Sequence, residues 1–263
     1  MIDGRFVRQT ISDDDWTKVV NMPGKWELAT QTQPTLTSDG GAKAAGLPRP
    51  SGNCVARAIA NSLLEGSDHT SEYAGKVYMA VATEIGRRNH DMYKSELDEA
   101  KKAAAYWEGK ARDWKASFVH YAEYDGYKKV AKAAKNWNDH IRKIETIKPD
   151  HTGAEDGSPL HVWRPFLKAL GYKSFVQRGE KLSVVEAAAL LDNAVVAIPG
   201  HAFALIAGFV VDSGPAGAIR RSNCFYTTSK NYGKHRKLRT IMTPTPATRG
   251  KLDELVAAWE ATQ

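Results

Sequence analysis

The sequence contains little cysteine and no long apolar run, and these absences narrow the classes of protein to which it can belong. Only Cys54 and Cys224 occur in 263 residues, so a disulfide framework is not expected, whereas a reducing compartment is. No apolar run approaches the roughly 20 residues that span a membrane. The start, Met1–Arg5, lacks the basic and then apolar pattern of a secretion signal. We therefore expect a cytoplasmic protein with no membrane partner.

Sequence patterns for common cofactors are missing as well. No spacing of cysteine and histidine is typical of zinc, and no glycine-rich phosphate-binding loop is present. We therefore expect neither a metal nor another cofactor. The length suits one large domain with an insertion or two small domains, and it allows a sizeable core.

One of the two cysteines lies where a helix is expected to begin. Ser51–Asn53 is a polar, glycine-containing turn, and apolar residues then follow at helical spacing, at Val55, Ile59 and Leu63. The N–H groups at a helix N-terminus favour an anion, so we expect a lowered pKa for the Cys54 thiol and a nucleophilic thiolate. A lone cysteine is alternatively a small core residue. The nucleophile hypothesis therefore needs a base elsewhere in the chain.

His201 is the best candidate for that base. Apolar runs bounded by turn residues predict three strands, at Asn193–Gly200, His201–Ala207 and Phe209–Asp212. Antiparallel pairing through a tight turn at Gly208 brings the far ends of the last two strands together. Asp212 is then expected to reach His201, fix its tautomer and stabilise the imidazolium. Cys54, His201 and Asp212 are thus our candidate catalytic residues.

The donor that would stabilise an oxyanion is less clearly indicated by the sequence. Asn53 precedes the nucleophile, and its side-chain amide is our candidate for this role. The backbone N–H of Cys54 at the helix end is an alternative donor. Asparagine also favours the position that caps a helix, so a purely structural role for Asn53 stays open.

These residues resemble the papain-like cysteine peptidase superfamily, in which a cysteine begins a helix and a histidine and an acid follow on sheet strands. Ser51–Ala58 is similar to the ovarian-tumour deubiquitinase motif Asp-Gly-Asn-Cys-Leu-Phe-Arg-Ala, with serine in place of the acid. Three segments resemble phage-encoded papain-like proteins more closely: Asn53–Ala58, Val162–Gly171 and Gly200–Asp212. The resemblance implies the fold and the residues Cys54, His201 and Asp212, but it does not imply a substrate. Because the most similar proteins are phage-encoded, we expect a phage origin and a host-cytoplasmic or virion-associated location. A protein or peptide substrate is expected from the hydrolase hypothesis itself.

The chain is basic, with 37 lysines and arginines against 30 acids and a net charge of +7. Basic residues gather in Lys234–Arg239 and along the middle of the chain, where aromatic residues are also frequent. Such a combination occurs in proteins that bind single-stranded nucleic acid. However, lysines alternate with acids in the middle segment, and the aromatic residues recur near helical spacing. A solvated amphipathic helix explains both features, so nucleic acid is not the favoured partner.

The order of the predicted elements gives an α+β fold with a papain-like core and an antiparallel sheet in its C-terminal half. The segment Thr35–Pro50 is predicted to be a loop or tether, and the helical insertion is predicted to break near Asp125–Gly126. A helix is expected over Thr70–Arg87, and Ser183 with Glu186 forms a capping box. The predicted parts are an N-terminal arm (1–50), the core (51–66 and 150–245), a helical insertion (67–149) and a C-terminal helix (246–263).

The favoured function is a cysteine hydrolase that cleaves a peptide or isopeptide bond through the candidate triad. Two alternatives come from other classes. The first is a virion-associated structural or assembly protein that keeps the scaffold without activity, using virion or host proteins as partners. The second is a nucleic-acid-binding protein that uses the basic helical segment. A transferase with the same triad has the same sequence signature as a hydrolase.

Overall fold

The computed structural model describes residues 40–47, 53–65, 70–117, 124–155, 157–175, 181–212, 218–221 and 236–263. The chain divides into two units, Met1–Pro34 and Thr35–Gln263, and all the described residues belong to the second unit. The sequence also indicates a strand at Lys25–Leu28 and an interior strand position for Cys224. Both lie outside the described residues.

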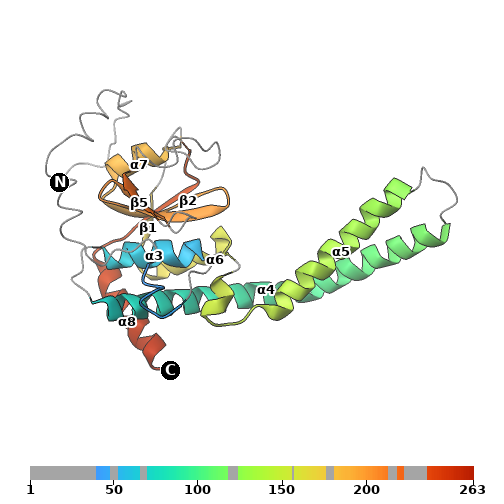
Figure 1. Cartoon of the computed structure of the whole chain (residues 1–263), viewed down its shortest axis with the longest axis horizontal. Coiled ribbons are helices and arrows are strands. Elements are labelled where there is room, and N and C mark those ends of the chain that lie inside the picture. Colours follow the sequence, from blue (N-terminus) through green and yellow to red (C-terminus); the bar gives the residue numbers. More distant parts are fainter. Residues whose placement is uncertain are drawn as a thin grey trace. The chain divides into compact units, whose positions relative to one another are not determined.

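The described residues form a mixed α+β structure, as the sequence predicts (Figure 1). The helices are α3 (Cys54–Leu64), α4 (Ser71–Ser117), α5 (Tyr124–Thr146), η2 (His151–Ala154), α6 (Leu160–Ala169), α7 (Val184–Leu190) and α8 (Ala247–Glu260). The strands are β1 (Lys173–Ser174), β2 (Asn193–Ile198), β3 (His201–Ile206), β4 (Phe209–Asp212), β5 (Ala218–Arg221) and β6 (Thr240–Thr243).

Within the described residues the strands form one antiparallel sheet in the order β1-β6-β2-β3-β4-β5. Two-residue turns join β2 to β3 and β3 to β4. Gly200 has a φ of 77° in the first turn, and both Ala207 (47°) and Gly208 (82°) have positive φ in the second. Positive φ at both central positions, as in the β3–β4 turn, matches the twist of the strands. The length of the two turns fixes the register of both hairpins.

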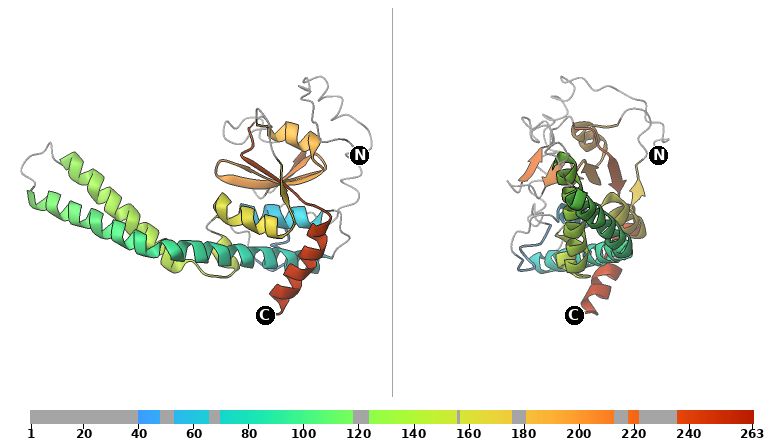
Figure 2. Two further views of the ribbon diagram at one scale, coloured as in Figure 1. Left: turned by 180° about the vertical axis from the view of Figure 1, so that it is seen from behind. Right: turned by 90° about the vertical axis from the view of Figure 1, so that its right-hand side faces the viewer.

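The sheet separates two apolar clusters, because successive side chains of a strand point to opposite faces. Val195, Ala197 and Ala202 pack in the cluster that contains α3 and the first part of α4. Val196 and Phe203 pack in the cluster that contains α7. Figures 1 and 2 show the same order of layers, with α7 on one side of the sheet and α3 between the sheet and α4.

Helix α3 is buried along its whole length after Cys54. Every residue from Val55 to Leu64 is buried, including the polar Arg57 and Ser62. The Ser62 hydroxyl lies 2.8 Å from the hydroxyl of Tyr172 and donates to the side chain of Asn193 at the start of β2. This end of α3 is therefore tied to the sheet, and its direction along β3 brings Cys54 to the other end of that strand.

The segment before α3, predicted to be a loop or tether, is described over residues 40–47 and has no regular helix or strand there. Residues 40–47 form a turn that packs against α3 and α4, and Ala42 is almost fully buried. Gly40 and Gly41 have φ of 61° and 95°. A side chain at Gly40 would contact the backbone of Arg57, and one at Gly41 would collide with the carbonyl of Ala74. The glycines thus allow the backbone to approach both helices, which composition alone does not indicate.

The predicted helix over Thr70–Arg87 is the first part of α4, which continues without a break to Ser117. Close backbone contact holds α4 against η2: the Cα of Gly86 lies where a side chain at Gly153 would point. The buried Asn89 donates from its amide to the carbonyl of Gly153 and to the hydroxyl of Ser158, both at 2.9 Å. This contact fixes the chain that returns from α5 beside the middle of α4.

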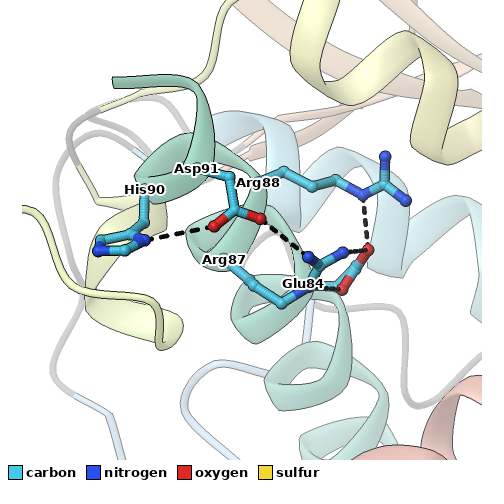
Figure 3. Close-up of polar contacts among 5 residues, drawn as sticks. All are labelled: Glu84, Arg87, Arg88, His90 and Asp91. Atoms are coloured by element: carbon cyan, nitrogen blue, oxygen red, sulfur yellow. Dashed lines mark hydrogen bonds and ion pairs between the residues drawn. The ribbon is translucent and has the colours of Figure 1, made fainter. Parts of the chain in front are cut away.

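Charged side chains of α4 form a hydrogen-bonded network just before this helix leaves the core (Figure 3). Glu84 accepts hydrogen bonds from Arg87 at 2.9 Å and from Arg88 at 2.6 Å, and Arg87 also donates to Asp91. Partial burial raises the pKa of Glu84, but the two arginines outweigh it and the net shift is downward. The Arg88 guanidinium lies 5.3 Å from the ring centre of Phe166, so the network also contacts α6.

The rest of α4 pairs with α5 in an antiparallel coiled-coil hairpin. A set of its buried and half-buried positions recurs alternately three and four residues apart, which is the heptad pattern of such a seam. These seam positions are Tyr93, Leu97, Ala100, Ala104, Trp107, Ala111 and Trp114 on α4, and Tyr127, Val130, Ala134, Trp137, Ile141 and Ile144 on α5.

The predicted break near Asp125–Gly126 is wrong, because both residues lie inside α5. The two helices are instead separated by residues 118–123, which lie outside the described residues. A side chain at Gly126 would meet the Trp114 ring at 2.6 Å. Gly126 is therefore a contact position of the coiled coil, where the small residue admits the indole.

Gly86→Ala is expected to destabilise the protein, because the added methyl would collide with the carbonyl of Asp150. We expect a loss of about 1–3 kcal/mol in the free energy of unfolding, as for other overpacked sites. Chemical denaturation measures it. Gly109→Ala is the matched control in the same helix, since nothing lies within 4 Å of its added methyl. That control should gain up to about 1 kcal/mol from helix propensity; equal effects of the two changes would contradict the packing interpretation.

Candidate active site

The three candidate catalytic residues lie at the ends of three elements. Cys54 is the first residue of α3, His201 is the first of β3 and Asp212 is the last of β4. In the β3–β4 pairing Ala204 lies opposite Val211, so His201 and Asp212 are diagonal neighbours on one face of the sheet. The predicted hairpin therefore brings its two functional ends together.

His201 and Asp212 form a short, buried contact. The Nε2 atom of His201 lies 2.6 Å from Oδ1 of Asp212, and the side chains are 14% and 3% exposed. The imidazole also lies beside the Phe203 ring, with 6.0 Å between ring centres. A carboxylate held this close in a buried position restricts the orientation of the imidazole and favours its protonated form.

Cys54 approaches the imidazole from the other side of the sheet. The strand alternation puts His201 on the face of Phe203, which packs towards α7, whereas α3 packs against the face of Ala202. The Cys54 thiol nevertheless hydrogen-bonds to His201 and to the backbone N–H of Ala202. This geometry is available because the paired part of β3 and β4 starts only at Ala204, beyond the strand end that holds the site.

The protonation of Cys54 and His201 is coupled. Burial raises the pKa of the Cys54 thiol, but the hydrogen bond and the positive charge of His201, with the N–H of Ala202, outweigh it and the net pKa is lowered. Burial alone would lower the pKa of His201, yet the hydrogen bonds to Asp212 and Cys54 raise it to about 10. Both shifts favour a thiolate–imidazolium pair at neutral pH.

Cys54 is not an ordinary core cysteine. Its side chain is only partly buried, in contrast to the ten buried residues that follow it in α3. A core position would exclude reagents from the sulfur and would leave it without a charged neighbour. The partial exposure and the contact with His201 therefore favour the nucleophile interpretation over the core interpretation.

Asn53 occupies the N-cap position of α3, as the capping alternative predicts, but its side chain makes no hydrogen bond to the first turn. Its Nδ2 instead donates to the hydroxyl of Tyr78 in α4. The backbone N–H of Cys54, in the first turn of the helix, has no acceptor within α3 and stays a candidate oxyanion donor.

Tyr78 and Ala202 are two neighbours of the site that the sequence did not indicate. The predicted helix over Thr70–Arg87 contains Tyr78, but no local pattern shows that its hydroxyl meets Asn53. Ala202 contributes only its backbone N–H, so its residue type carries no signal. The register of the β2–β3 hairpin, in which Ala197 pairs with Ala202, sets the direction of this N–H, because N–H groups alternate in direction along an antiparallel strand.

No group of three or more histidine, cysteine or acidic side chains within the described residues could hold a metal ion. None of the described helices combines the length and the apolar character needed to cross a membrane.

The comparisons with known proteins give no relative. No family model matches the chain, and no significant match is found among curated proteins or among solved structures.

Replacing His201 by alanine should raise the pKa of the Cys54 thiol, because burial remains while the imidazolium is lost. Alkylation by iodoacetamide, followed against pH, reports the thiolate. The wild-type rate is expected to reach its plateau below the usual thiol pKa of about 8.5, and the midpoint of His201→Ala should lie above that of the wild type. Coincident pH profiles of the two proteins would show that His201 does not lower the pKa of the Cys54 thiol.

Asp212→Asn should lower the pKa of His201, since the hydrogen bond to this carboxylate is the largest influence that raises it. Imidazole resonances followed by NMR during a pH titration measure the change. The rate of acyl transfer should also fall, by roughly 10²- to 10⁴-fold, the range that general acid–base catalysis contributes. An unchanged pKa of His201 in this variant would show that Asp212 does not stabilise the imidazolium.

Proposed function

We propose that the protein is a cysteine hydrolase that cleaves a peptide or isopeptide bond. One observation carries the proposal: Cys54, His201 and Asp212, from α3 and two strands far along the chain, form a continuous chain of hydrogen bonds. A nucleophile bonded to a base, and a base bonded to an orienting acid, is the arrangement expected for nucleophilic catalysis. The lowered pKa of the thiol and the raised pKa of the imidazole support this reading.

The first half of the reaction makes an acyl-enzyme. The Cys54 thiolate attacks the carbonyl carbon of the scissile bond, and the carbonyl oxygen becomes an oxyanion. The tetrahedral intermediate collapses as the carbon–nitrogen bond breaks, and the His201 imidazolium gives its proton to the leaving amine. The products are a thioester on Cys54 and a free amine, with His201 left neutral.

The second half releases the acyl group. Neutral His201 accepts a proton from water, and the hydroxide oxygen attacks the thioester carbonyl. The carbon–sulfur bond then breaks, which yields a carboxylic acid and restores the thiolate beside the imidazolium. Asp212 keeps the imidazole oriented in both halves and stabilises its charged form. An amine in place of water would give a transferase from the same site.

The resemblance to papain-like peptidases agrees with this assignment, and the protein or peptide substrate is part of the proposal. The short likeness of Asn53–Ala58 and Gly200–Asp212 to phage-encoded proteins supports a phage origin for the chain. A host or virion protein is then the expected substrate or partner. The papain-like core is part of the proposal, and its support is the order of helix, histidine strand and acid strand along the chain.

The nucleic-acid alternative stays unfavoured. Several lysines of the α4–α5 hairpin are neutralised by acids three or four residues away on the same helix, or by an acid on the facing helix. These pairs are Lys102 with Glu99, Lys128 with Asp125, Lys135 with Asp139 and Lys101 with Glu145. Such pairs are typical of the solvated surface of a long helix.

The proposal predicts that p-nitrophenyl acetate acylates Cys54. Intact mass spectrometry of the wild-type protein, quenched at low pH, should show one added acetyl group, and release of p-nitrophenolate should follow the pH profile of the thiolate. Cys54→Ala should show neither, while its circular dichroism spectrum stays unchanged. Equal acylation of the wild type and Cys54→Ala would refute the proposed function.

A further inference from the structure

We propose that Tyr78 is a positioning residue, whose hydroxyl orients the Asn53 amide so that this amide stabilises the oxyanion. The inference rests on the proposed function of Cys54 and adds a residue from a different helix to its site. Tyr78 lies in α4, and its hydroxyl contacts the amide of Asn53, the residue immediately before Cys54. The Cα atoms of residues 53 and 54 are about 3.8 Å apart, as in any trans peptide.

The contact lies in the interior of the protein. Asn53 is 2% exposed and Tyr78 is 1% exposed. The Asn53 side chain does not cap α3, so no local structural need explains why an amide is buried here. A buried amide is costly when one of its atoms lacks a hydrogen bond, by about 1–3 kcal/mol. Its presence beside a candidate nucleophile therefore calls for a functional reason.

The hydrogen bonding of the amide depends on which of its atoms faces Tyr78. With Nδ2 towards Tyr78, the buried Oδ1 atom has no hydrogen-bond partner within the part of the chain that the structure describes. The oxygen and nitrogen of an amide have nearly the same shape, so a half-turn exchanges their places. In that orientation the Tyr78 hydroxyl donates to Oδ1, and the two N–H groups of Asn53 become the donors on the opposite side.

N–H donors beside Cys54 are what an oxyanion requires. Turned away from Tyr78, the amide N–H groups can donate to the negative oxygen that forms when the thiolate attacks a carbonyl. The backbone N–H of Cys54, which has no acceptor within α3, supplies a further donor at the same end of the helix. Tyr78 thus determines which atom of the Asn53 amide faces the site, and the amide N–H groups donate to the substrate oxyanion.

Two reactions of Cys54 distinguish this role from a structural one. Alkylation by iodoacetamide passes through no oxyanion, whereas acylation by p-nitrophenyl acetate does. Tyr78→Phe keeps the ring and removes only the hydroxyl. We expect it to slow acylation by roughly 10- to 100-fold, the effect of a misplaced catalytic group, and to leave the rate and pH profile of alkylation unchanged.

Asn53→Ala should slow acylation by about 10²- to 10³-fold, as the loss of one oxyanion donor does in other enzymes. Because Tyr78 acts through Asn53, the double variant should be no slower than Asn53→Ala alone. Multiplied effects of the two changes would show that Tyr78 acts independently of Asn53, and would overturn the proposal.

Tyr172→Phe is the matched control. Tyr172 is another buried tyrosine whose hydroxyl contacts α3, but at Ser62, far from Cys54 along the helix. It should leave both rates unchanged. If Tyr78→Phe and Tyr172→Phe lower alkylation and acylation alike, the Tyr78 hydroxyl is structural. If Tyr78→Phe changes neither rate while Cys54 is still acylated in the wild type, this inference fails and the proposed function stands.

Discussion

The burial of α3 between the sheet and α4 is the constraint on which the rest of the structure depends. Ten successive residues of this helix are buried, so it cannot rotate or slide without disrupting both apolar faces. Contacts between Ser62 and Asn193 tie one end of α3 to the start of β2. The other end, with Cys54, is thereby held at the beginning of β3. Cys54 contacts His201 because the packing of α3 fixes the position of its first residue.

The sheet supplies the second half of the site through its hairpins. The β3–β4 turn places two residues in positive φ, at Ala207 and Gly208, and this register brings Asp212 beside His201. The Cys54 thiol and the His201–Asp212 pair then meet at the strand end, although α3 and the imidazole belong to different faces of the sheet. The contact sets the pKa values of both groups. Burial by itself would favour a neutral thiol and a neutral imidazole, but the hydrogen bonds and charges among Cys54, His201 and Asp212 favour the charged forms.

The coiled-coil hairpin is built by a different rule from the core. Its heptad seam uses small residues such as Ala100, Ala104 and Ala134 between aromatic ones, so the two helices pack closely over a narrow stripe. The core instead fixes α4 by backbone contact at Gly86 and by the buried amide of Asn89. One helix thus serves two packing environments, and the charged network at Glu84 lies close to the change between them.

The sequence by itself determined the local elements and the chemical types of the site. The helix from Cys54 to Leu64, the strands that begin at His201 and end at Asp212, and the capping box at Ser183 all follow from patterns within a few residues. Only the tertiary structure decided that Cys54 meets His201, that Asn53 contacts Tyr78 and that Gly126 lies inside a helix. The reason is physical: hydrogen bonding and apolar spacing act over neighbouring residues, whereas these contacts depend on how whole helices and strands pack together.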